Sequence, residues 1–143
     1  MTAKQYLMGY RNLESSYKCA IEEYKNVENE MISLKSPNLT ERVQTSPKKD
    51  PIGEIVIDME KEKAKLGINI QYYKSQMLVI RSQIKDMKLI NEDYCAILLF
   101  RYVLYKDWKY ICNSLAMSRT QANKVHGMAL LEFDRKFGHC YEK

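Results

Sequence analysis

Proline and glycine are scarce in this sequence, with three prolines and five glycines among 143 residues. An all-β fold needs many turns, and turns depend on these two residue types, so the scarcity argues against a sandwich or barrel. The longest apolar run, Cys95 to Phe100, has six residues, whereas a membrane-spanning helix needs about 20. We therefore expect an all-α protein that does not enter a membrane.

Four cysteines occur, at Cys19, Cys95, Cys112 and Cys140. No two of them have the Cys-x-x-Cys spacing of a zinc site, and His139 beside Cys140 has no second ligand pair nearby. The sequence also lacks a Ser-His-Asp, paired-carboxylate or phosphate-loop pattern. We therefore predict a protein that is not an enzyme and that binds no metal or other cofactor. Because no apolar signal segment follows Lys4, we expect it in the cytoplasm with reduced thiols.

Two long segments, residues 1–34 and 52–90, carry a heptad pattern. In the first, apolar or tyrosyl residues alternate in steps of four and three, at Tyr6, Tyr10, Leu13, Tyr17, Ala20, Tyr24, Val27, Met31 and Leu34. In the second, the same alternation runs from Ile52 to Met87 and is interrupted only by Lys63. On a helix, each of these two patterns forms an apolar stripe, here called a seam. The two seams predict two long helices, with Gly67 as a weak position in the second. Pairing within one chain would give a helical hairpin, and pairing between chains a coiled coil; the pattern permits both.

The segment between the two seams, residues 35–51, holds all three prolines, Pro37, Pro47 and Pro51, among Ser, Thr, Asn and Lys. Proline cannot continue a helix, and this polar composition cannot bury a core. We expect a flexible loop there.

The pattern changes again in residues 91–143, where we expect a separate C-terminal domain. Ser118 with Gln121 three residues later has the form of a capping box, which opens a helix. A short helix, a tight turn and a longer helix together predict a helix-turn-helix. The expected elements are a helix capped by Asn91 and continuing to Tyr105, a helix from Trp108 to Leu115 capped by Asp107, a turn at Ala116-Met117, and a last helix from Ser118 to about Phe137.

Polar and basic residues fall on the first half of that last helix. They are Arg119, Thr120, Gln121, Asn123 and Lys124, and Lys109 adds a cation on the preceding helix. The net charge is only +5, but no acid occurs from Trp108 to Leu131, so this region is locally basic. Arg and Lys can donate to guanine, and Gln or Asn can pair with adenine. The segment therefore predicts a face that binds double-stranded DNA, with Arg119 reading a base and Lys124 contacting a base or a phosphate.

Four short motifs lie between Asn91 and Phe133, namely Phe100-Arg101-Tyr102, Ile111-Cys112, Met117-Ser118-Arg119 and Ala129-Leu130. Together they resemble region four of bacterial sigma factors, the domain that reads the upstream promoter element. The segments 108–111 and 125–130 are more similar to the sigma-like transcription regulators of phages and prophages of Gram-positive bacteria, of the RinA and ArpU type.

This resemblance covers only the C-terminal part of the chain. Carried over by position, the DNA-reading residues of the family match Arg119, Thr120, Gln121, Asn123 and Lys124. The family often has basic residues where Gln121 and Asn123 stand, so the face is less basic here. No segment resembles the polymerase-binding or strand-opening regions of a complete sigma factor. The resemblance implies an accessory regulator whose partners are double-stranded DNA and RNA polymerase.

We therefore expect a sequence-specific DNA-binding regulator of transcription. The long helices would serve as dimerisation or polymerase-contact elements, and we predict a homodimer because an exposed seam of this length is unusual on a monomer. Two other classes fit the same pattern: a phage DNA-packaging subunit of the small-terminase kind, which would form a ring, and a protein-docking helical module that never binds DNA. Oligomeric state separates the first two classes, and salt-dependent DNA binding excludes the third.

Overall fold

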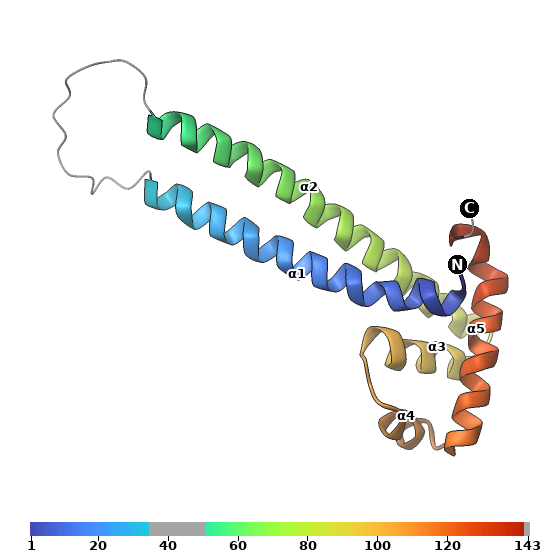
Figure 1. Cartoon of the computed structure of the whole chain (residues 1–143). Coiled ribbons are helices and arrows are strands. Elements are labelled where there is room, and N and C mark those ends of the chain that lie inside the picture. The colour runs from blue at the N-terminus through green and yellow to red at the C-terminus, as the bar shows by residue number, and fades with distance from the viewer. Residues whose placement is uncertain (35–50, 142–143) are drawn as a thin grey trace, which may run out of the picture. The chain divides into compact units, whose positions relative to one another are not determined.

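The computed structural model describes residues 1–34 and 51–141, and all regular structure in these ranges is helical, which confirms the all-α class. The elements are α1 (Ala3–Leu34), α2 (Pro51–Asp86), the 3-10 turn η1 (Met87–Leu89), α3 (Glu92–Leu98), the π-helical η2 (Leu99–Val103), α4 (Trp108–Leu115) and α5 (Arg119–Tyr141) (Figure 1). None of these helices has the length and hydropathy needed to cross a bilayer. The loop expected at 35–51 lies outside the described residues except for Pro51, which opens α2 at a position that suits proline.

Two predicted helix ends are wrong. The helix expected to reach Tyr105 is α-helical only through Leu98, continues as a π-helix and ends at Val103. There the Lys106 N–H donates to the Phe100 carbonyl at 2.8 Å, and Tyr105 adopts a φ of 55°. The last helix continues past Phe137 to Tyr141, because the ring of Tyr141 stacks on that of Tyr6 at a centroid distance of 4.5 Å. The second correction arises from a contact between distant positions, which a local pattern does not contain.

The chain divides into two compact units, Met1–Ser15 with Lys74–Lys143 (unit 1) and Ser16–Tyr73 (unit 2). In unit 2 the segments of α1 and α2 run side by side in opposite directions (Figure 1), since Tyr24 lies beside Gly67 and Glu28 beside Lys63. The buried core of unit 2 consists of Val27, Met31 and Leu66, with Tyr24, Val56 and Met59 packed against it. The two seams therefore meet within one chain in this unit.

Lys63, the interruption in the second seam, has a structural explanation in unit 2. Its Nζ lies 3.9 Å from Glu28 Oε2 and 5.1 Å from the centroid of the Tyr24 ring. The aliphatic part of a lysine can cover apolar surface while its charge finds a carboxylate and an aromatic face. The lysine thus occupies a seam position without leaving its charge unpaired.

Unit 1 has a core that draws on the start of α1 as well as on the C-terminal helices. Its fully buried large side chains are Leu7, Ile84, Met87, Ile97, Leu98, Ile111 and Phe133. The ring of Tyr6 packs 6.0 Å from that of Phe133, and its hydroxyl donates to Gln83 Oε1 at 2.8 Å. The first turns of α1 therefore belong to the same folded unit as α3, α4 and α5.

Candidate nucleic-acid interface

α4 and α5 begin where their caps predict. The N-cap of α4 is Asp107, whose Oδ1 accepts a hydrogen bond from the Tyr110 N–H at 2.8 Å. Ser118 precedes α5, and its Oγ accepts from the Gln121 N–H at 3.1 Å. Each bond satisfies one of the N–H groups that a helix start leaves without a partner. The capping roles predicted for Asp107 and Ser118 are confirmed.

A short turn joins the two helices. Ala116 ends α4 in the left-handed conformation, with φ 53° and ψ 48°, and its N–H donates to the Cys112 carbonyl. The Met117 N–H donates to the same carbonyl at 3.0 Å. This is a common way to end a helix, but it is usually made by glycine, since a Cβ in this conformation costs about 1 kcal/mol. The tight ending leaves only Met117 and Ser118 before α5 begins.

The buried side of α5 determines which side faces solvent. Ala122, Ala129 and Phe133 are fully buried, and α5 contacts both α3 and α4. Small residues at 122 and 129 allow the helix backbones to approach closely. Leu115 of α4 and Val125 of α5 are half-buried.

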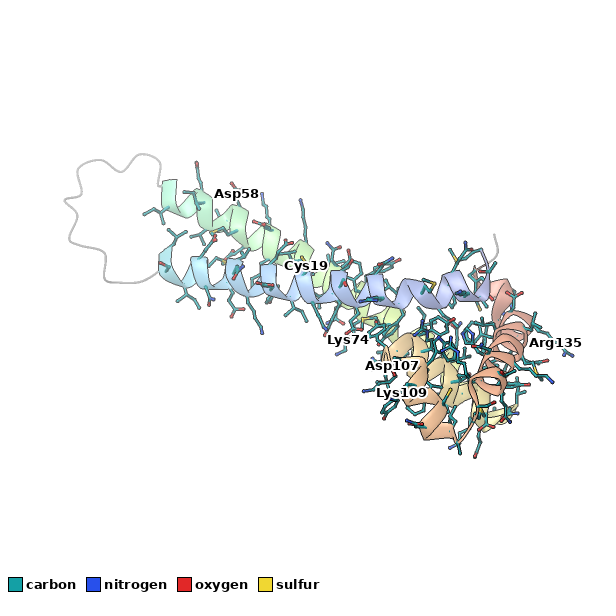
Figure 2. All side chains as sticks on the ribbon, turned by 60° about the horizontal axis from the view of Figure 1, so that its bottom comes forward. Cys19, Asp58, Lys74, Asp107, Lys109 and Arg135 are labelled. Carbon is teal, nitrogen blue, oxygen red and sulfur yellow. The ribbon has the colours of Figure 1, made fainter. Side chains whose placement is uncertain are left out.

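All six predicted DNA-contacting side chains, Arg119, Thr120, Gln121, Asn123, Lys124 and Lys109, are exposed. At about 100° of rotation per residue, Thr120 and Lys124 each lie roughly 160° from Ala122, so they point most directly away from the core. Gln121 and Asn123 lie to either side of them. Lys109 extends from α4 and is labelled in Figure 2, on the opposite side of unit 1 from Arg135 in that view. One helix face thus presents most of the predicted site.

Arg119 lies against the ring of Trp108. Its Cζ is 4.6 Å from the centroid of that ring. Such a contact stabilises an exposed pair by about 0.5–1 kcal/mol, so the guanidinium is oriented by α4 although it remains accessible. Whether Arg119 reads a base stays a prediction.

The residues around Trp108 form a cluster that spacing in the sequence did not predict. Arg101 Cζ lies 5.0 Å from the centroid of the Trp108 ring, and the centroid of His126 lies 5.1 Å from it. The hydroxyl of Tyr102 and His126 Nε2 are 2.8 Å apart. Positions 101, 108 and 126 share no helical or strand period, so spacing could not indicate this cluster. The only sequence feature that pointed to it was the motif that contains Arg101 and Tyr102.

The pair of Tyr102 and His126 is uncharged at neutral pH. Burial lowers the pKa of His126 to about 4, and the positive charges of Lys4 and Arg101 act in the same direction. Burial also raises the pKa of Tyr102 to about 12. The imidazole of His126 therefore adds no positive charge to the cluster around Trp108. The cations of that cluster are arginine side chains.

Comparison of the chain with protein-family models, with curated proteins and with solved structures finds no significant match.

Proposed function

We propose that the chain is a sequence-specific regulator of transcription that binds double-stranded DNA through a helix-turn-helix and catalyses no reaction. The helix-turn-helix would consist of α4, the turn at 116–118 and α5. The observation that carries the proposal is that α5 has one buried side and one polar, exposed side. Its Ala122 side is buried, while its first half presents polar and basic side chains to solvent. In helix-turn-helix proteins this half of the second helix enters the major groove.

The side-chain chemistry of this face supports the proposal. Thr120 and Lys124 point outward, and a lysine can donate to guanine or to a phosphate. Lys109 would meet the backbone on the α4 side, where a cation strengthens binding to any sequence. The resemblance to sigma-like phage regulators adds RNA polymerase to the same proposal, and the long heptad pattern adds a homodimeric partner.

Two charge-matched variants test the binding face. Lys124→Gln and Arg135→Gln each remove one positive charge from α5, and helical periodicity places both residues roughly on the same side of the helix. Only Lys124 lies in the first half of α5, whereas Arg135 pairs with Glu132 at 3.3 Å further along. Duplexes selected from a random library would be titrated by fluorescence anisotropy at several salt concentrations.

We expect Lys124→Gln to weaken binding and, if Lys124 contacts a phosphate, to reduce the salt slope by about one. Arg135→Gln should bind as the wild type does. Equal effects of the two variants would show that the first half of α5 is not the binding face. If the wild type binds no duplex, a protein-docking helical module becomes the better hypothesis for the function.

Arg119 offers a separate test of sequence reading. Arg119→Lys keeps the charge but loses the paired donors that match a guanine. We expect it to lose about 1–3 kcal/mol on the selected sites while its binding to random duplexes changes little. An equal loss on both kinds of duplex would assign Arg119 to the backbone instead.

A further inference from the structure

A cleft of about 510 Å³ in unit 1 lies beside the proposed DNA-binding face. α1 contributes Lys4 and Arg11 to it, η2 contributes Arg101, α4 contributes Trp108, and α5 contributes Asn123 and His126. A volume of this size is typical of sites for small ligands or for part of a larger one. The cleft is therefore built from four separate elements of one folded unit.

Three cations converge on this cleft. Lys4, Arg11 and Arg101 line it, and no carboxylate does so in the part of the chain that the structure describes. Glu14 is nearby, but its Oε2 accepts a hydrogen bond from the Tyr105 hydroxyl at 2.7 Å and it is not part of the lining. Like charges repel in a partly enclosed space, so an anion bound between them would relieve the repulsion.

Aromatic rings hold the guanidinium groups in place. Arg11 Cζ lies 5.3 Å from the centroid of Tyr105, and Arg101 Cζ lies 5.0 Å from that of Trp108. Arg101 Nη1 also donates to the Lys106 carbonyl at 3.4 Å. Tyr105 itself has a φ of 55°, a conformation that a tyrosine rarely adopts and that is often found where function requires it. The two guanidinium groups of the cleft are thus oriented before any ligand arrives.

We propose that this cleft binds a phosphate group. A phosphate offers negative charge and several acceptor oxygens to the cationic side chains, and guanidinium groups match its geometry with paired donors. Asn123, Tyr102 and His126 add neutral polar groups to the lining. The phosphate can come from the DNA backbone or from a free phosphate compound, and the two sources are separable by experiment.

The first arm uses inorganic pyrophosphate and the fluorescence of Trp108. This residue is the only tryptophan in the chain and it lines the cleft, so its emission reports on this site directly. The test variant is Lys4→Gln with Arg11→Gln, both exposed on α1. The charge-matched control is Lys85→Gln with Lys88→Gln, which are exposed in unit 1 but do not line the cleft. Sodium chloride of equal ionic strength corrects for screening.

If free phosphate is the source, pyrophosphate changes the Trp108 emission saturably in the wild type and in the control. The affinity of the test variant for pyrophosphate should then be lower by a factor of about ten or more. The second arm titrates the same proteins with duplex DNA. If the backbone is the source, the test variant loses DNA affinity and its salt slope falls by about two, while the control changes less. The inference is overturned if the test variant matches the control in both arms.

This inference does not depend on the proposed function, and the two can fail separately. Pyrophosphate binding that requires Lys4 and Arg11, in a protein that binds no duplex, would retain the phosphate site and reject DNA binding. DNA binding that depends on Lys124 but not on Lys4 and Arg11, without pyrophosphate binding, would reject the phosphate site alone.

Discussion

The neutral state of His126 makes the stability of unit 1 sensitive to acid. In the unfolded chain this histidine has its ordinary pKa of 6.5, whereas in the folded protein the pKa is about 4. A group with a lowered folded-state pKa stabilises the fold fully above its unfolded pKa, and the contribution is lost as the pH falls towards the folded value. Protonation would place a third positive charge beside Lys4 and Arg101. Stability should therefore fall between pH 6.5 and about pH 4.

The magnitude follows from the two pKa values. At about 1.4 kcal/mol per pKa unit, a fall from 6.5 to about 4 corresponds to roughly 3 kcal/mol. His126 is only partly buried, so screening by solvent reduces the contribution to about 1–2 kcal/mol. Most of this contribution should already be lost near pH 4.5.

The variant His126→Gln isolates this effect, because glutamine carries no proton-dependent charge and can still accept a hydrogen bond from Tyr102. Urea unfolding would be followed by circular dichroism at about pH 7 and about pH 4.5. Between these conditions the wild type should lose about 1 kcal/mol more than the variant. His139→Gln, a change at an exposed histidine of the same helix, should behave as the wild type does. An identical pH dependence of wild type and His126→Gln would refute the argument.

Three further predictions concern stability and assembly. Ala116→Gly should raise the free energy of unfolding by about 1 kcal/mol, since φ there is 53°; an unchanged urea midpoint would contradict this. Gly67→Ala should stabilise α2 by about 0.5–1 kcal/mol, because the new Cβ would meet only Tyr24 Cε2, at 3.9 Å; thermal unfolding measures it. Self-association through the N-terminal helices stays a prediction. Because the seams meet within unit 2, it would use exposed residues such as Ile57 and Ile68, and a monomer in sedimentation at high concentration would rule it out.

The helix starts of the C-terminal part were predictable because caps are local. The Asn91 side chain accepts from the N–H of Asp93 at 2.8 Å, two residues away. Asp107 and Ser118 act over three residues. Each of these bonds needs only a short polar side chain and the helix that follows it. The exposure of the predicted contact residues on α5 follows in the same way, from the 3.6-residue period and the burial of Ala122.

The cleft could not be predicted, because it depends on contacts between distant positions. Nothing in the heptad pattern distinguishes Lys4 and Arg11 from other charged residues of the first helix. They face Arg101 and Trp108 only because Tyr6 and Leu7 enter the core of unit 1. The π-helical end before Tyr105 was likewise not predictable, since the apolar run there is compatible with a regular helix. Local rules therefore describe the elements, and tertiary packing decides which side chains meet.

The division of unit 1 into two stretches of sequence affects the order in which the chain can fold. All of unit 2, Ser16–Tyr73, is continuous and lies between these stretches. Closing a long loop costs chain entropy, and native contacts between distant positions slow folding. Pairing of α1 with α2 in unit 2 brings Ser16 and Tyr73 to the same end of that pair, which shortens the loop that unit 1 must close. A substitution that leaves a cavity in the core of unit 2, such as Leu66→Ala, should thus slow the assembly of unit 1. The native contacts within unit 1 should stay intact.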